Sequence, residues 1–302
     1  MSELAVAAPS QSLPIVMDDG IKLDTKAARA YGQTMHEAYA NARPYPHAVI
    51  DNFLPDALIS KIVANFPRRS VEDEEIFQLG HIGHHKRQIP PANCDGFNRE
   101  LFNFFNSAPI LRFLEGISGI KGLLSDPYFS GGGFHEISRG GMLGIHADFR
   151  LNKPLNLHRR LNMLIYLNSD WKEEWGGQLE IWDRGMTHKV VGVSPLVNRC
   201  VIFNTDAYSY HGHPDALNCP EKVTRKSIAL YYYTASDSIL SEIPDQPTVY
   251  VDRPDEQAHH AKSPLSLKFE KLMGGIMPPL LSRAIFRMRL KLRAERSQGC
   301  GK

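Results

Sequence analysis

The sequence predicts a mainly β protein with flanking helices. Residues 125–236 contain many short apolar segments separated by turn residues, whereas residues 25–124 are rich in helix-forming residues. Short strands with turn signals between them are typical of a β-sandwich or barrel. We therefore divide the 302-residue chain into four parts. These are a flexible lead (1–24), a helix-rich N-terminal part that packs on the core (25–124), a β core (125–236), and a linker with a basic C-terminal helix (237–302).

The helix-rich part begins with a segment of helix-forming composition that ends before the prolines at 44 and 46. Asp56 is a residue type that caps helix N-termini, and apolar residues follow it on one stripe as far as Phe66. The expected elements are helices at Thr25–Ala42, Asp56–Phe66 and Phe102–Gly116, and a short strand at His47–Phe53.

The β core alternates apolar and polar residues over segments of four to eleven residues. Glycines at 131–133 and 176–177 suit turns or bulges between them. The expected strands are Tyr128–Ile137, Gly141–Phe149, Leu161–Leu167, Gln178–Trp182, Lys189–Val193, Arg199–Asn204, Tyr208–His211 and Arg225–Ala235.

The C-terminal segment 280–296 has apolar residues at helical spacing, interleaved with six basic residues: Arg283, Arg287, Arg289, Lys291, Arg293 and Arg296. A basic amphipathic helix is typical of membrane-surface or partner binding. We expect peripheral contact with an anionic membrane, with a docked structural helix as the alternative.

Composition sets broad limits. The chain is 42% hydrophobic and 23% charged, which is ordinary for a soluble domain. A formal net charge of +2 argues against a general polyanion binder, so no nucleic-acid partner is expected. The four cysteines form no CxxC motif, which favours a reducing compartment. With no signal-like start and no long apolar run, we expect a cytoplasmic protein.

Three residues stand out as a metal-ligand set. His146 and Asp148 lie in an extended segment, GMLGIHADF, and side chains at i and i+2 of a strand share a face. His211 follows in SYHGHP, although His213 shares its spacing and competes with it. Two imidazoles and one carboxylate hold non-haem Fe(II) and leave coordination sites open. We expect these residues to be both the metal ligands and the catalytic centre.

A carboxylate-binding pair follows on the last predicted strand. Arg225 and Ser227 are again at i and i+2, in RKSIALYYY, so they share a face. A guanidinium binds a carboxylate with two parallel hydrogen bonds. If Arg225 points inward, then Lys226 points outward, and the inward residues are Arg225, Ser227, Ala229 and Tyr231. Lys226 is the alternative should the register be reversed.

The motifs HADF, RRLNMLIYLN, WGGQLEIWD, SYHGHP and RKSIALYYYT occur in this order over residues 125–236. Together they resemble the prolyl-4-hydroxylase-like branch of the Fe(II)/2-oxoglutarate-dependent oxygenases. The resemblance implies a double-stranded β-helix (jelly-roll) core. It also implies use of Fe(II), 2-oxoglutarate and O₂, with ascorbate as an additional reductant. The reaction it implies is hydroxylation with release of succinate and CO₂.

The resemblance also bears on single residues. The family ligand directly follows the aromatic residue that ends its strand, here Tyr210, which favours His211 over His213. Prolyl hydroxylases typically have Lys where this chain has Arg225, which argues against prolyl specificity. A peptidyl proline is one candidate substrate, and the basic mouth and tail favour an anionic glycan or lipid-linked sugar as the other. Asn162 and Tyr166 lie on a core strand and are candidate contacts for 2-oxoglutarate.

Several basic residues surround the predicted site. The loop 149–160 leaves the strand that carries two ligands, so it suits a lid over the metal, and its basic residues favour an anionic substrate. The candidate substrate residues are Arg139, Arg150, His158 and His213. The histidines of HIGHHKR (His81, His84 and His85) have no carboxylate or Cys partner at metal spacing, which favours a solvated or substrate-facing loop.

A different class of function is a catalytically silent jelly-roll module that binds a glycan or a peptide. The complete set of three metal ligands and an oxoacid-binding arginine favours the enzyme, because a binding module has no need of an open ferrous site.

Overall fold

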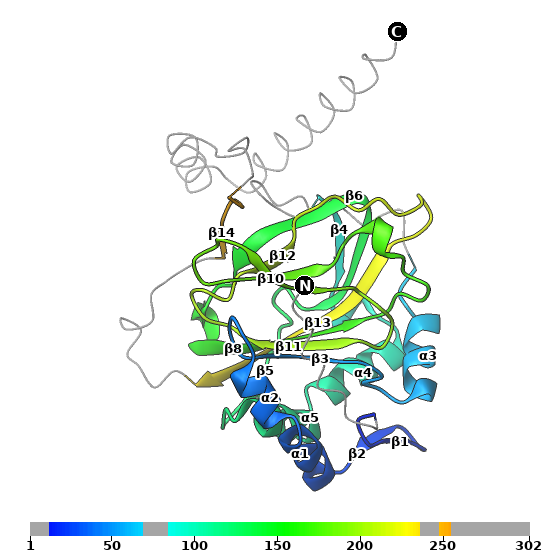
Figure 1. Cartoon of the computed structure of the whole chain (residues 1–302). Coiled ribbons are helices and arrows are strands. Elements are labelled where there is room, and N and C mark those ends of the chain that lie inside the picture. The colour runs from blue at the N-terminus through cyan, green and yellow to red at the C-terminus, as the bar shows by residue number, and fades with distance from the viewer. Residues whose placement is uncertain (1–11, 69–83, 236–247, 255–302) are drawn as a thin grey trace, which may run out of the picture. The chain divides into compact units, whose positions relative to one another are not determined.

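The computed structural model describes residues 12–68, 84–235 and 248–254 (Figure 1). The predicted helix at 280–296 and His81 lie outside these residues. No helix in the described part of the chain is long and apolar enough to cross a membrane.

Five α-helices occur in the described part of the chain, all within residues 25–118. Two of them begin after an aspartate cap: Asp24 accepts hydrogen bonds from two backbone amides of the helix Thr25–Gln33, and Asp95 accepts one from the helix Gly96–Phe105. Asp56 was expected to cap the helix that follows it, but Pro55 is at the cap position and Asp56 is the first helical residue. Gly119, in the left-handed conformation, ends α5. The helices are α1 (Thr25–Gln33), α2 (His36–Asn41), α3 (Asp56–Ala64), α4 (Gly96–Phe105) and α5 (Ala108–Ser118), with 3₁₀ turns η1 (Pro91–Asn93), η2 (Lys153–Leu155) and η3 (Glu173–Trp175).

The strands form one antiparallel sheet that nearly closes on itself, in the manner of a double-stranded β-helix, beside a separate hairpin of β1 (Ile15–Met17) and β2 (Ile21–Leu23). The main path runs β10 (Lys189–Val193), β9 (Leu179–Trp182), β12 (His211–His213), β6 (Gly133–Ala147), β13 (Arg225–Ala235), β8 (Leu157–Tyr166), β11 (Cys200–Asn204) and β3 (His47–Ile50). Shorter strands pair along it: β4 (His84–Ile89), β5 (Leu124–Ser125), β7 (Leu151–Asn152) and β14 (Val249–Tyr250). The predicted class, mainly β with flanking helices and a jelly-roll core, is confirmed.

The two faces of the larger half of the sheet have different roles. Ile228, Leu230 and Tyr232 of β13 point outward into an apolar core shared with the helices, which cover this face in Figure 1. The alternate residues of β13 point inward and line a pocket between the two halves of the sheet. This is the inward register expected from the sequence. Lys226 lies outside, with its ammonium 5.5 Å from the centre of the Phe66 ring.

Several element boundaries differ from the sequence expectation. Thr25–Ala42 is two helices, α1 and α2, and the helix expected at Phe102–Gly116 is α4 followed by α5. Tyr128–Ile137 and Gly141–Phe149 belong to one long strand, β6, because the intervening glycines make an irregularity within the strand rather than a turn. The strand expected at Tyr208–His211 is β12, at His211–His213.

Three segments expected to be irregular contain strands. The lead at 1–24 includes the β1–β2 hairpin, and the linker at 237–302 includes β14, which pairs with β6. HIGHHKR was expected to be a loop, but its residues from His84 onward belong to β4, which also pairs with β6. The expected lid at 149–160 is β7, η2 and the first residues of β8, paired back onto the sheet.

Candidate metal centre and co-substrate pocket

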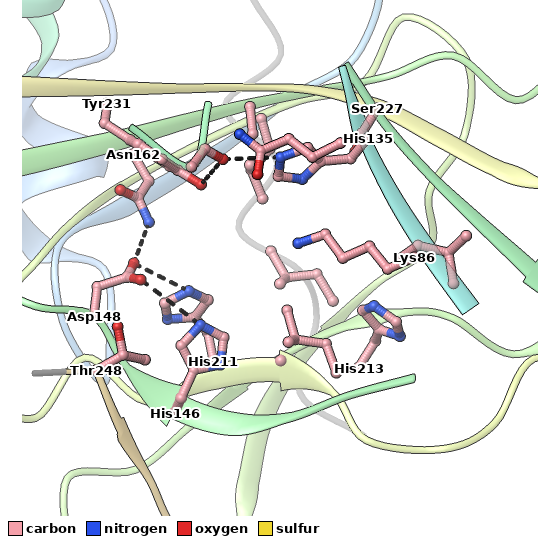
Figure 2. Close-up of a pocket in the computed structure, with 18 of the residues that line it drawn as sticks. Lys86, His135, His146, Asp148, Asn162, His211, His213, Ser227, Tyr231 and Thr248 are labelled. Carbon is pink, nitrogen blue, oxygen red and sulfur yellow. Dashed lines mark hydrogen bonds and ion pairs between the residues drawn. The ribbon is translucent and has the colours of Figure 1, made fainter. Parts of the chain in front are cut away.

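His146, Asp148 and His211 come together in the pocket. One potential ligand atom from each lies within 4.8 Å of the others. Nε2 of His146 is 3.7 Å from Oδ1 of Asp148, and Nε2 of His211 is 3.5 Å from Oδ2 (Figure 2). The two histidines face each other because β12 pairs with β6 at these residues.

The donor set fits a divalent metal ion. Nδ1 of His146 lies 2.9 Å from the Gly144 carbonyl, and Nδ1 of His211 lies 2.9 Å from the Ser209 carbonyl. A carbonyl oxygen only accepts, so each Nδ1 carries the proton and each Nε2 presents a lone pair to the site. Burial lowers the pKa of both imidazoles, that of His146 to about 4, which keeps them neutral as ligands.

Asp148 is held by two neighbours on β8. Asn162 Nδ2 donates to Oδ2 over 2.7 Å, and Arg159 Nη2 is 3.0 Å from the same oxygen. Burial by itself raises the pKa of Asp148, but the charge of Arg159 and the bond from Asn162 outweigh it. The pKa therefore lies well below its usual range. Asp148 is thus an anionic, oriented ligand.

Strand irregularities direct these side chains. Tyr232 pairs with Leu161, but Tyr233 pairs with Arg159, so β8 carries one extra residue at this point. A bulge of this kind reverses the alternation of side chains, and both Arg159 and Asn162 consequently point inward. A similar shift on β6, between the pairs His211–His146 and His213–Leu143, places Leu143 and His146 on the same face although they are three residues apart.

The glycine within HGH is required by close packing. A Cβ atom at Gly212 would lie 2.6 Å from the Gly144 carbonyl oxygen, which is too close for any side chain. The two strands can therefore approach closely at the point where they present His146 and His211.

Arg225 reaches the same pocket from β13. Its Nε donates to the Gly177 carbonyl over 2.8 Å, and its Nη2 lies 3.3 Å from the Tyr166 hydroxyl. Gly177 has a φ of +73°, and a Cβ there would lie 3.0 Å from Arg225 Cδ. Gly177 thus gives Arg225 the space to lie along the backbone. Burial is the main influence on the guanidinium and lowers its pKa from the ordinary value, while Tyr166 partly offsets this effect.

The pocket has a volume of about 220 Å³. Of the residues that the sequence analysis singled out, His146, Asp148, Asn162, Tyr166, His211, His213, Arg225 and Ser227 line it. Arg139, Arg150 and His158 lie outside its lining. Arg139 donates instead to the Cys219 carbonyl over 2.7 Å, and the segment of Arg150 and His158 is folded back onto the sheet by the β7–β8 pairing.

Sequence reasoning missed several pocket residues. Lys86 and Gln88 enter from β4, which lacks the alternation of apolar and polar residues that indicates a strand. Tyr250 enters from β14 and Thr248 from the residue just before it, and the Tyr250 ring centre is 5.1 Å from that of His146. Arg159 was expected at a basic mouth, yet it is buried with its guanidinium carbon 3.7 Å from the Tyr231 ring centre. No feature of these segments in the sequence indicates their role.

The fold and the pocket define a 2-His-1-carboxylate centre on a double-stranded β-helix. Residues 132–233 match the family model described as the 2OG-Fe(II) oxygenase superfamily. The matched segment contains His146, Asp148 and His211, so the similarity to this superfamily covers all three residues of the metal-ligand cluster.

Similar solved structures include a prolyl-4-hydroxylase from Pseudomonas putida, at 19% identity and a TM-score of 0.47, covering 67% of this chain and 98% of that one. A prolyl hydroxylase from Trichoplax adhaerens, in complex with a peptide fragment of the hypoxia inducible factor oxygen degradation domain, is 20% identical with a TM-score of 0.46. That match covers 69% of this chain and 91% of the other. HygX from Streptomyces hygroscopicus, with nickel and 2-oxoglutarate bound, is 13% identical with a TM-score of 0.44, covering 69% and 93%. A search of curated proteins found no match.

Proposed function

We propose that this protein is a hydroxylase that couples oxidation of its substrate to the decarboxylation of 2-oxoglutarate. The observation that carries the proposal is the presence, in one pocket, of the His146–Asp148–His211 cluster and the buried Arg225. The three-residue cluster suits Fe(II), and Arg225 suits the distal carboxylate of a 2-oxo diacid.

The polar residues of the pocket have different roles, some toward 2-oxoglutarate and others toward Asp148. Arg225 supplies the charge, and Ser227 and the Tyr166 hydroxyl supply hydrogen bonds from the same wall of the pocket. Asn162 donates to Asp148, so we assign it the positioning of that carboxylate in place of a contact with 2-oxoglutarate. Arg159 offsets the buried charge of Asp148 when no metal is bound.

Iron bound by these ligands would supply the activation of O₂. In the balanced reaction, one oxygen atom enters the substrate C–H bond as a hydroxyl group, and the other enters succinate as 2-oxoglutarate loses CO₂. Ascorbate would serve as an additional reductant. The protein itself contributes neutral imidazoles, an oriented carboxylate and a pocket lined by residues from both halves of the sheet.

For the primary substrate we retain a peptidyl proline and an anionic glycan or lipid-linked sugar as the two candidates. Arg225 in place of the usual prolyl-hydroxylase lysine weakens the prolyl candidate.

The test is turnover of 2-oxoglutarate to succinate with added Fe(II), measured across peptide and glycan panels. We expect Asp148→Ala to abolish turnover and metal binding while the circular dichroism spectrum is retained. His211→Ala should lose the metal, whereas His213→Ala should retain it. If the wild-type protein binds neither metal nor 2-oxoglutarate, the chain is instead the silent jelly-roll binding module.

We further propose a cytoplasmic enzyme that associates peripherally with anionic membranes through residues 280–296. Each basic residue near such a surface contributes roughly 1 kcal/mol at low salt. Co-sedimentation of the full chain with anionic vesicles, compared with a chain ending at residue 279, tests this. Retention of the full chain in the supernatant at low salt would contradict it.

A further inference from the structure

The charged residues that line the pocket are unbalanced. Among the described lining residues, Asp148 is the only carboxylate, whereas Lys86, Arg159 and Arg225 are cations. A bound Fe(II) brings two positive charges and a bound 2-oxoglutarate brings two negative ones, so these cancel. The loaded pocket therefore keeps a surplus of two positive charges. Charges of one sign gathered in a pocket without counter-ions are unfavourable, so this surplus indicates that a further anion binds.

Lys86 is the remaining cation, because Arg225 is assigned to 2-oxoglutarate and Arg159 is paired with Asp148. It faces Ile137 of β6, which in turn faces Arg225 of β13, so the three residues form one row across the sheet. Neighbouring strands are roughly 4.8 Å apart, which places the backbones of Lys86 and Arg225 about two strand spacings, roughly 10 Å, from each other. The other co-substrate groups, Ser227 and Tyr166, lie on β13 and on β8 beyond it, farther from Lys86.

The Lys86 ammonium has no partner in the pocket. Figure 2 shows the side chain pointing into the centre of the cavity, and no hydrogen bond or ion pair joins it to another residue drawn there. Burial and the nearby Arg225 lower its pKa to about 8, so it is mainly protonated at neutral pH. Its neighbour Arg87 points to the opposite face, where it pairs with Glu136 at 2.7 Å. Of these two adjacent basic residues, Arg87 is neutralised by Glu136, whereas Lys86 has no counter-ion in the pocket.

A second unpartnered group lies beside Lys86. His213 is 3% exposed, and neither of its ring nitrogens has a hydrogen-bond partner among the described residues. Both residues line the same pocket, and the charge of Lys86 is one of the influences that lower the pKa of His213, so the two side chains are near neighbours (Figure 2). A buried imidazole usually bonds to something, and an orphaned one beside an unpaired ammonium indicates a place for a hydrogen-bonding ligand.

We propose that Lys86 and His213 bind a carboxylate of the primary substrate, and thereby select an acidic substrate for the iron centre. This inference rests on the proposed hydroxylase function and adds the chemical class of the substrate to it. The carboxylate would come from an acidic sugar or from an acidic side chain next to a proline, and these two sources are separated below.

The experiment compares probes that differ only in one acidic group. Methyl glucuronide is paired with methyl glucoside, and acetyl-Glu-Pro-amide is paired with acetyl-Gln-Pro-amide. Binding of each to the full chain loaded with Mn(II) and 2-oxoglutarate is measured by calorimetry. Hydrogen bonds to charged groups contribute about 1.5–3 kcal/mol, so the acidic member of at least one pair should bind about tenfold tighter or more.

Three variants test the assignment. Lys86→Met should bring the ratio between acidic and neutral probes to near one, while Lys86→Arg should keep most of it. Lys226→Met is the matched control, because it removes the same charge from the outer face of β13, and it should keep the wild-type ratio. The pair that shows the preference identifies a sugar or a peptide as the source.

Two results would overturn the inference: no preference for the acidic probe in either pair, or an equal preference in Lys86→Met and wild type. The inference would also fail if Lys86→Met lost as much affinity for 2-oxoglutarate as Arg225→Met. That result would assign Lys86 to the binding of the co-substrate. Metal and 2-oxoglutarate binding by the wild type are measured first. Their absence contradicts the hydroxylase function itself, and is thereby distinguished from a failure of the inference.

Discussion

The side-chain amide of Asn162 donates to Asp148 Oδ2 over 2.7 Å, and so fixes the one carboxylate of the metal-ligand cluster from the neighbouring strand. The amide oxygen of Asn162 in turn accepts from Arg159 Nη2 over 2.8 Å, and that nitrogen also contacts Asp148. The three side chains form a closed polar group in which each orients the other two. Its effect is to leave the second oxygen of Asp148 free for the metal.

Asn162→Ala should weaken metal binding while leaving the three ligands in place. Residues that orient metal ligands typically contribute roughly 10- to 100-fold in affinity, and we expect a loss in that range for Mn(II) measured by calorimetry. Asn106→Ala is the control, since its amide donates to the Asp126 carbonyl away from the pocket. Equal affinities in both variants would show that Asp148 needs no orientation by β8.

Arg159→Leu should destabilise the metal-free protein. The substitution leaves Asp148 as a buried carboxylate without its ion-pair partner, which typically costs about 3–5 kcal/mol in the free energy of unfolding. Arg160→Leu provides a neighbouring control, because Arg160 is half-buried and makes only a 3.4 Å contact with Thr234. It should cost about 1 kcal/mol or less.

Urea denaturation of both variants measures this difference. Saturating Mn(II) should restore part of the stability lost in Arg159→Leu, because the metal then compensates the charge of Asp148. Equal losses in the two variants, or no recovery with metal, would contradict the assigned role of Arg159.

Arg225→Met should impair binding of 2-oxoglutarate and leave metal binding intact. Loss of one partner from a desolvated charge pair costs about 2–5 kcal/mol, so the dissociation constant should rise at least about 30-fold. Lys226→Met changes the adjacent residue on the opposite face and should alter the constant less than about threefold. Calorimetry in the presence of Mn(II) measures both, and the reverse ranking would place Lys226 in the pocket.

Much of the site could be predicted because strand alternation is regular over short distances. His146 and Asp148, and likewise Arg225 and Ser227, are two residues apart on strands, so each pair shares a face whatever the remaining structure. The outward position of Lys226 follows from the same rule. These predictions needed only the existence of a strand and not its exact limits.

The rest depends on features that alternation does not reveal. A bulge in β8 turns Arg159 inward, and another in β6 places Leu143 and His146 on one face although they are three residues apart. Lys86 lies on a strand whose inward residues are polar because they line a pocket, so the apolar pattern of a strand is missing. Tyr250 joins the site through a two-residue strand, too short to be recognised from sequence.

The stability of the metal-free protein should fall as the pH is lowered from 7 to 5. Burial holds the pKa of His135 and His213 well below the ordinary value of a histidine, and lowers that of His146 to about 4. In the unfolded chain these imidazoles take up a proton near pH 6.5. Between about pH 6.5 and pH 4 the unfolded state therefore binds more protons than the folded state, so acidification favours unfolding.

The expected size follows from the same linkage. For His146 alone, the free energy of unfolding should decrease by about 2 kcal/mol between pH 7 and pH 5. Lys86, with a pKa of about 8, stays protonated in both states over this range and contributes no slope. Asp148, whose pKa is depressed, adds to the loss of stability only at lower pH, near the usual range of a carboxyl group and below.

Urea denaturation at pH 7 and pH 5, with metal removed by a chelator, measures the effect. His135→Asn removes one buried imidazole that is not a metal ligand and should reduce the dependence on pH. His188→Asn removes an exposed histidine, whose side chain is 69% accessible, and should leave the dependence unchanged. If wild-type stability is the same at both pH values, the pocket histidines take up protons equally well in the folded and unfolded states. That result would contradict the burial of these imidazoles.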